Sequence, residues 1–250
     1  MITITLTCRH CGSPDLIKYG TAPNGKQKYF CRTCRRQSRD NPGSTAYSEE
    51  QREIILRAYQ ERSSLRGLER TFGVARSTVI GWLKKVQQLK PLEQTLVPTV
   101  PGDRSTLDLE LDELWSFVAK KANQRWIWFA LCRKTRQIVA FVLGDRSETT
   151  CRKLWHAIPQ TYRRGTCYTD FWQAYQTVIP EEQHQPSGKE TGETAHVERF
   201  NNTLRQRLAR FVRKTLSFSK SDLMHELCLR LFIWRYNLDI YARYLQAIDL

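Results

Sequence analysis

An alternating run of leucines and carboxylates at residues 107–115, LDLELDELW, constrains the fold more than any other part of the chain. A period of two predicts a β-strand with leucines on one face and carboxylates on the other. The run is followed by two apolar stretches, RWIWFALC and QIVAFVLG, and by a helical stretch, SETTCRKLWHAI. A short strand, GTCYTD, and a helix, FWQAY, complete the pattern. This order predicts an α/β domain with a mixed sheet and flanking helices.

Three acids occupy special positions in such a domain. The element order matches the ribonuclease H-like fold, in which three acids converge on a metal site: one at the end of the first strand, one after the fourth and one on a late helix. Here these acids are Asp112, Asp170 and Glu198. Carboxylate oxygens suit Mg²⁺, and two such ions can activate an attacking oxygen and stabilise a leaving one. The three residues together predict phosphoryl transfer on DNA.

Each of these residues has a simpler interpretation when taken alone. An isolated aspartate is more often a cap or a surface residue, and Asp170 could cap the helix that follows it. Glu113 is the rival for the first position, but a regular strand would point it toward the leucine face. Tyr168 and Tyr175 could be recombinase nucleophiles, although their apolar neighbours favour the core. His196 could assist a proton transfer, although such a histidine more often contacts phosphate or caps a helix.

A basic segment, ERFNNTLRQRLARFVRKTLSFSK, runs from Glu198 to Lys220 and contains seven basic residues. We expect one helix here, with Glu198, Asn201, Asn202, Arg205 and Ala209 on one side. A solvated basic helix is the alternative for a bare charge run. The acids upstream favour a site in which the segment holds DNA phosphates beside the metal. The DNA contacts expected in this segment are Asn201, Asn202, Arg205, Arg210, Arg213 and Lys214.

Two cysteine pairs lie near the start of the chain, CRHC with Cys8 and Cys11 and CRTC with Cys31 and Cys34. Two knuckles at this spacing favour one structural zinc ion with four thiolate ligands over a redox pair. The chain between them can fold as a hairpin that turns at Asn24 and Gly25. His10 is a bystander, since four thiolates fill the shell. The surrounding basic residues predict that this module contacts DNA.

Three short helical stretches follow the linker-like DNPGST at residues 40–45. Ser48 and Gln51 predict a capping box that opens a helix through about Arg62. SSLRGLERTF ends at Gly73 and ARSTVIGWLKKV follows, which is the helix-turn-helix pattern. A small helical bundle without DNA contact is the alternative. The expected core of the helix-turn-helix is Val74, Val79, Trp82 and Leu83. Its expected DNA contacts are Arg76, Ser77, Thr78 and Lys84.

Stretches rich in proline and glycine divide the chain. The clearest boundary is KPLEQTLVPTVPGDR, which has three prolines and a glycine. We expect a zinc ribbon at 1–40, a helix-turn-helix domain at 46–90, a linker at 91–105, the catalytic domain at 106–220 and a C-terminal amphipathic helix at 221–250. Apolar residues recur every three or four positions in the last helix, which would pack on the catalytic domain or on another protomer.

The formal net charge of +15 indicates a polyanionic partner. No apolar stretch approaches the length of a spanning helix, and the start, MITITLTC, lacks the features of a signal peptide. Nucleic acid inside the cell is therefore favoured over a membrane. The cysteines outside the two pairs are scattered singly through apolar surroundings, which predicts buried free thiols and a reducing cytosol. They are Cys132, Cys151, Cys167 and Cys228.

Over nearly its full length the chain resembles the DDE transposases of the bacterial insertion sequence one family. The resemblance rests on the cysteine pairs, on LDELWSFV, RWIWFA and YTDFWQAY, and most specifically on HVERFNNTLRQRLARFVRKTLSFSKS. It implies that Asp112, Asp170 and Glu198 form an acidic triad that binds two Mg²⁺ ions, with Mn²⁺ as a substitute. Water would cut the element's ends to 3′ hydroxyls, which would then attack target DNA directly.

The expected partners are double-stranded DNA, both as terminal inverted repeats and as target, and at least one further copy of the chain. We expect no membrane and no small-molecule substrate, and a location at the nucleoid in a bacterial cytoplasm. One alternative is a non-catalytic zinc and helix-turn-helix regulator, which would bind DNA without cutting it in magnesium. Another is a ribonuclease H-like nuclease that cuts without joining. The separate recognition modules and the presence of all three acids favour the transposase.

Overall fold

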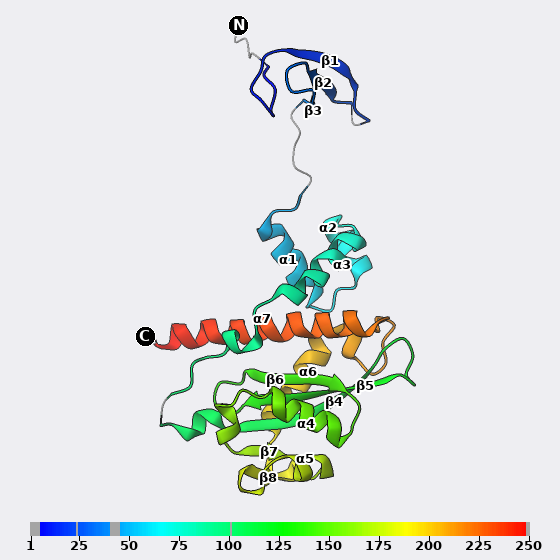
Figure 1. Cartoon of the computed structure of the whole chain (residues 1–250). Helices are drawn as coiled ribbons and strands as arrows, with labels where there is room; N and C mark the ends of the chain where they lie inside the picture. The colour runs from blue at the N-terminus through cyan, green and yellow to red at the C-terminus, as the bar shows by residue number, and fades with distance from the viewer. Residues whose placement is uncertain (1–5, 24, 41–45, 101, 249–250) are drawn as a thin grey trace. The chain divides into compact units, whose positions relative to one another are not determined.

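The computed structural model describes residues 6–23, 25–40, 46–100 and 102–248 (Figure 1). The chain forms two compact units, Met1–Gln51 and Arg52–Leu250. The finer division into five segments stays a prediction. Asn24 of the predicted turn and residues 41–45 of the predicted linker lie outside the described residues.

The first unit contains a small antiparallel sheet. Its strands are β1 (Leu16–Thr21), β2 (Gln27–Cys31) and β3 (Gln37–Arg39), in the order β1-β2-β3. The β1–β2 pair is the hairpin that the sequence predicts, and Gly25 has a positive φ of 76° in the connection, where a side chain would be strained. β3 is absent from the prediction because its three polar residues carry no apolar period.

Three short helices follow: α1 (Glu49–Tyr59), α2 (Leu65–Phe72) and α3 (Arg76–Lys84). The predicted capping box is confirmed, since the Ser48 backbone N–H donates to Gln51 Oε1 at 3.0 Å and the Gln51 N–H donates to Ser48 Oγ at 3.2 Å. α2 ends at Gly73, which takes the left-handed conformation with φ 65°.

The predicted core of these helices is confirmed at three of its four positions. Val74, Val79 and Leu83 are buried, but Trp82 is only partly buried. A helix of nine residues buries one narrow stripe, which Val79 and Leu83 occupy four positions apart. Trp82 lies at the flank of that stripe, so the prediction that it belongs to the core is wrong.

A five-stranded mixed sheet forms the centre of the second unit. Its strands, in the spatial order β6-β5-β4-β7-β8, are β4 (Leu109–Phe117), β5 (Gln124–Cys132), β6 (Ile138–Gly144), β7 (Cys167–Thr169) and β8 (His184–Pro186). β4, β5 and β6 pair antiparallel, whereas β7 runs parallel to β4 and β8 runs parallel to β7. The predicted mixed sheet is confirmed. β4 begins at Leu109, because Arg104–Leu107 forms a 3-10 turn.

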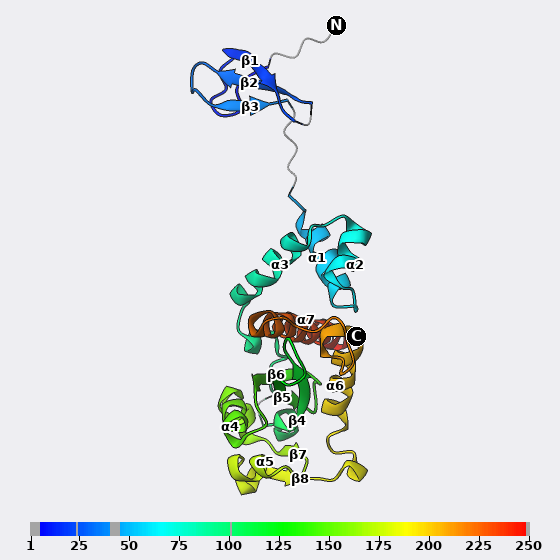
Figure 2. The same cartoon turned by 90° about the vertical axis from the view of Figure 1, so that its right-hand side faces the viewer.

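Helices cover both faces of this sheet. One face packs on α4 (Glu148–Ala157) and α5 (Gln173–Val178), and the other packs on α6 (Ala195–Arg207) and α7 (Asp222–Ile248). Figure 2 shows α4 and α6 on opposite sides of the strands. Both faces of β4 are therefore buried. Leu109 and Leu111 belong to the core on the α4 side, and Leu114 belongs to the core on the α6 side.

The predicted single helix over residues 198–220 is wrong in its second half. α6 ends at Arg207, and the chain continues as a 3-10 turn at Ala209–Phe211. Ala209 therefore does not extend the face that carries Glu198. The last helical carbonyl has a partner far away in the sequence, because Arg207 O accepts a hydrogen bond from the Arg62 backbone N–H at 2.7 Å.

The C-terminal helix α7 is buried on more than one side, which differs from the simple amphipathic helix that was predicted. Leu229, Phe232 and Ile233 join the core beneath the sheet. On another side, Cys228 Sγ lies 3.2 Å from the hydroxyl oxygen of Tyr59 on α1. α7 thus packs between the sheet and the three short helices of its own chain. Among the described residues, no helix combines the length and the apolar character needed to cross a bilayer.

Candidate active site

Asp112 lies in the middle of β4, on the face that α6 covers. Its Oδ1 accepts the backbone N–H of Glu113 at 2.8 Å, and its Oδ2 accepts the amide Nδ2 of Asn201 at 2.7 Å. Burial, together with the charges of Glu113, Asp170 and Glu198, raises the pKa of Asp112 to about 7. Since such repulsion requires proximity, the three predicted acids lie near one another in the folded chain.

Asp170 directly follows β7, the parallel neighbour of β4. Its Oδ1 accepts the backbone N–H of Trp172 at 3.0 Å, just before α5 begins. Asp170 therefore contributes to a local turn, as the simpler interpretation predicts. Its charge also raises the pKa of both Asp112 and Glu113, so the same carboxylate faces the acidic cluster.

Glu198 lies in the first turn of α6, where the helix dipole favours a negative charge. The hydroxyl of Thr194 donates to its Oε1 at 3.4 Å. One turn further along, Asn201 is 9% exposed, and its Oδ1 is buried without a hydrogen-bond partner. A buried amide oxygen without a partner is costly unless a donor or a cation faces it.

These oxygens suit a hard divalent cation, because carboxylate and amide oxygens are the ligands that Mg²⁺ prefers. The acids are more widely spaced than the thiols of the first unit. Among the described residues, the four cysteines alone form a group of three or more potential ligands whose donor atoms all lie within 4.8 Å of one another.

Glu113 points to the opposite face of β4, as a regular strand requires. Its carboxylate accepts hydrogen bonds from Arg146 Nε at 2.6 Å and from the hydroxyl of Tyr175 at 2.9 Å. Arg146 in turn lies over the rings of Trp126 and Trp172, at 4.9 and 4.1 Å from their centroids. The Glu113 carboxylate is thus engaged in hydrogen bonds within the protein. Tyr175 is fully buried in the core, as predicted.

Glu110 is a buried carboxylate that the sequence interpretation missed. It is fully buried, and its Oε2 accepts the backbone N–H groups of His196 and Val197 at 2.9 and 3.0 Å. Its Oε1 lies 2.5 Å from His196 Nδ1 and 3.2 Å from Arg133 Nε. The one available signal was its place on the same strand face as Asp112. His196 thus contacts a carboxylate at the start of its helix.

The predicted DNA-contacting residues near the acids differ in their surroundings. Arg205 is partly buried, and burial together with the charge of Arg213 lowers its pKa. Its guanidinium donates to the carbonyl of Phe211 at 3.1 Å. Asn202, Arg213 and Lys214 are exposed.

Arg210 is only partly exposed and contacts other residues of its own chain. Its guanidinium donates to Ser219 Oγ at 3.0 Å and to the hydroxyl of Tyr59 on α1. A hydrogen-bonded guanidinium that is shared between two segments stabilises their packing. Arg210 therefore joins α1 to the chain that follows α6.

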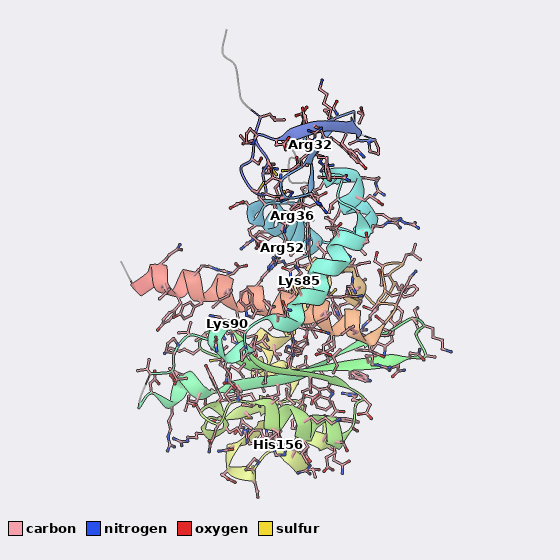
Figure 3. All side chains as sticks on the ribbon, turned by 45° about the horizontal axis from the view of Figure 1, so that its top comes forward. Arg32, Arg36, Arg52, Lys85, Lys90 and His156 are labelled. Atoms are coloured by element: carbon pink, nitrogen blue, oxygen red, sulfur yellow. The ribbon has the colours of Figure 1, made fainter. Side chains whose placement is uncertain are left out.

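On the short helices, Arg76 is half exposed and pairs with Glu69 at 3.1 Å. Ser77 and Lys84 are exposed, and Thr78 is partly buried. A groove of about 590 Å³ runs beside them, and the basic residues among those that line it are Arg66, Arg76, Arg210 and Lys220. Further exposed basic side chains include Lys85 and Lys90 (Figure 3).

Residues 106–238 match a protein family that is described as IS1 transposase. The match covers more than half of the chain. This chain belongs to the IS1 transposase family. It is thereby a transposase, a DNA-processing enzyme, as the resemblance implies.

Curated relatives agree with this family. The insertion element iso-IS1n protein InsB of Shigella dysenteriae is 40% identical over 126 residues, which cover 50% of this chain and 92% of the relative. The insertion element IS1 protein InsB of Shigella flexneri is 38% identical over 117 residues, which cover 47% of this chain and 86% of the relative. Among solved structures, the Mos1 transposase paired-end complex with left transposon end matches with a TM-score of 0.29 and 9% identity, over 82% of each chain. A TM-score this low does not establish a shared fold.

In this IS1 family member, the four cysteines of the first unit form a compact group that could hold a metal ion. Cys8 Sγ lies 3.6 Å from Cys34 Sγ, and Cys11 Sγ lies 3.6 Å from Cys31 Sγ. The backbone N–H of Cys34 donates to Cys31 Sγ and lowers the pKa of that thiol, which favours the thiolate form.

The histidine between the first two cysteines stands apart from this group. His10 Nε2 lies 3.4 Å from the carbonyl oxygen of Gln37. The remaining cysteines are free and buried, as predicted; they are Cys132, Cys151, Cys167 and Cys228.

Proposed function

We propose that this transposase binds the terminal inverted repeats of an insertion sequence, cleaves the ends to 3′ hydroxyls and joins them to target DNA by two-metal-ion phosphoryl transfer. One observation carries the proposal. The charges of Asp170 and Glu198 raise the pKa of Asp112, although the three acids come from a strand, a loop and a helix far apart in the sequence. Natural chains rarely gather partly buried like charges without a cation or a catalytic role.

We also propose that the second unit has the ribonuclease H-like fold. Three antiparallel strands are followed by two parallel ones in the order β6-β5-β4-β7-β8, with helices on both faces. In this arrangement the first strand is central, so that residues on it can meet residues from β7 and α6. The strand order supports the proposal independently of the acids.

The proposed ligands of Mg²⁺, or of Mn²⁺ in its place, are Asp112, Asp170 and Glu198. When bound, the two ions would stabilise charge on the attacking and leaving oxygens. The chain's own residues prepare this site. Asn201 holds Asp112 by a hydrogen bond to Oδ2, while Trp172 N–H holds Asp170. Asp112 thus has both carboxylate oxygens held by hydrogen bonds and Asp170 has its Oδ1 held, which reduces the reorganisation needed on binding.

The basic side chains around the acids are proposed to bind the DNA backbone. Asn201, Asn202, Arg205, Arg213 and Lys214 would hold phosphates near the scissile bond. We leave Arg210 out of this set, because its guanidinium already bonds Ser219 and Tyr59. Arg205 lies close enough to Asp112 for the two charges to interact, so its cation can balance the acidic cluster.

For recognition of the ends, we propose that α2 and α3 act as a helix-turn-helix. Arg76, Ser77, Thr78 and Lys84 would contact the DNA, and the basic groove beside them would follow its backbone. We propose that the four cysteines bind one structural Zn²⁺ as a zinc ribbon, because thiolates prefer this ion and the first unit has little other core. An assembly of at least two copies, located at the bacterial nucleoid in the cytoplasm, completes the proposal.

The proposed function can be tested with purified protein, Mg²⁺, supercoiled plasmid and a labelled duplex that ends in the inverted repeats beside its gene. We expect joined products from the wild type and none from Glu198→Gln. Glu226→Gln, an exposed glutamate on α7, is the matched control and should join normally. End binding without cutting in Mg²⁺ or Mn²⁺ would favour a regulator, and cutting without joining would favour a nuclease.

A further inference from the structure

The buried carboxylate of Glu110 fastens the beginning of α6 to the central strand. It accepts two consecutive backbone N–H groups from the first turn of the helix and a third hydrogen bond from the ring of His196. The first N–H groups of a helix have no partner within the helix, and the dipole favours an anion there. Glu110 therefore satisfies donors that would otherwise be buried without partners.

Arg133 extends this contact into a partly buried cluster. Its guanidinium lies 3.2 Å from Glu110 and 2.8 Å from Glu193, and it covers the ring of Tyr168 with its central carbon 4.0 Å from the ring centroid. The charge of Glu110 is thus compensated by one cation and several donors. A fully buried carboxylate with this many partners has one favourable position.

The cluster has a regular relation to the proposed acids. Three of its members each precede one acid by two positions: Glu110 before Asp112, Tyr168 before Asp170 and His196 before Glu198. On a strand, residues two apart share a face. Glu110 and Tyr168 are moreover paired in register between β4 and β7. The cluster therefore links the three chain segments that carry the acids, through residues two positions before each acid.

We propose that Glu110, held by His196 and Arg133, is a positioning residue that sets the spacing of Glu198 from Asp112. This inference rests on the proposed function, because the spacing matters only if these acids share a cation. Glu110 does not touch the cation or the DNA. It acts through α6, whose first turn carries both its hydrogen-bond donors and Glu198.

The test compares Glu110→Gln with Asp108→Asn in zinc-loaded full-length protein. Asp108 is the matched control, because it directly precedes the same strand and accepts a backbone N–H, from Thr166 at 3.0 Å, without touching α6. Two quantities are measured. One is the free Mn²⁺ concentration that half-saturates the protein, by electron paramagnetic resonance, and the other is the hydrogen-exchange rate of the amides at residues 196–198. We expect Glu110→Gln to raise the half-saturating concentration and the exchange rate at least about tenfold each, while Asp108→Asn changes neither more than about twofold.

A second pair of variants keeps the test decisive if Glu110→Gln does not fold. His196→Asn retains a side-chain donor near the position of Nδ1, whereas His196→Ala removes it. We expect the asparagine variant to bind Mn²⁺ nearly as the wild type does and the alanine variant to bind it more weakly.

The inference is overturned if Glu110→Gln, or His196→Ala in its place, loses thermal stability but keeps wild-type Mn²⁺ half-saturation, since the role would then be structural only. If the wild type binds no Mn²⁺, both the proposed function and the inference about spacing are wrong. The exchange rates of amides 196–198 in Glu110→Gln still show separately whether Glu110 holds α6.

Discussion

Asp112 bears its negative charge at a cost in folding stability, so Asp112→Asn should stabilise the protein when no divalent cation is present. Burial and the neighbouring acids raise its pKa from 3.8 to about 7. At about 1.4 kcal/mol per pKa unit, the full shift corresponds to about 4 kcal/mol. Asp112 is partly exposed to solvent, so we take about half of this, about 2 kcal/mol, as the expected gain.

The sign of the pH dependence follows from the direction of the shift. The folded state holds the Asp112 proton more tightly than the unfolded state does, so wild-type stability falls as the pH rises from about 4 to about 7. The advantage of Asp112→Asn should therefore be larger at about pH 8 than at about pH 5. The new amide also finds a partner, because the free Oδ1 of Asn201 can accept a hydrogen bond from it after the Asn201 amide flips.

Urea unfolding, followed by tryptophan fluorescence at both pH values, measures this gain. The buffer should lack magnesium but contain no strong chelator, since a chelator would also remove metal from the cysteine group. Excess Mg²⁺ should stabilise the wild type more than Asp112→Asn and so reduce the difference. The reasoning is refuted if Asp112→Asn is no more stable than the wild type at about pH 8 without Mg²⁺.

Three further predictions concern other parts of the chain. A strong chelator, or Cys31→Ser, should unfold the first unit, while circular dichroism should show unchanged helical content in the second unit. If the nuclear magnetic resonance spectrum of the first unit stays unchanged, a structural metal is contradicted. Arg210→Ala should lower the free energy of unfolding by about 2 to 3 kcal/mol, since it removes the charged hydrogen bonds that the buried hydroxyls of Ser219 and Tyr59 accept, whereas exposed Arg213→Ala should leave stability unchanged and weaken DNA binding on all sequences; equal stabilities would contradict the internal role. Arg76→Ala should weaken binding to the inverted repeats by about 1 to 3 kcal/mol more than binding to a random duplex, and an equal loss on both in gel-shift titrations would argue against base contact.

Local periodicity was enough to predict the parts of the second unit that depend on neighbouring residues. Alternation identified β4 and placed Glu113 on the face opposite Asp112, and the order of apolar runs predicted the mixed sheet. The capping box at Ser48 is likewise a local contact. The alternation and the capping box are each decided within a few residues of sequence, and the mixed sheet follows from the order of such local patterns.

Features that depend on distant partners could not be predicted in this way. Alternation cannot distinguish a solvent-facing carboxylate from one covered by a helix, so it did not reveal that Glu110 is buried beneath α6. A basic run does not show where its helix ends, because the Arg207 carbonyl finds its partner at Arg62. The two-sided burial of α7 similarly depends on packing against elements early in the chain.

The central claim is that Asp112, Asp170 and Glu198 share a divalent cation, and iron-mediated cleavage of the protein tests it most directly. Fe²⁺ with ascorbate replaces the native ion and cuts the backbone beside its binding site, and mass spectrometry locates the cuts. The account predicts cuts around residues 112, 170 and 198 that excess Mg²⁺ suppresses together. Cuts that miss these segments, or that persist unchanged in excess Mg²⁺, would contradict it.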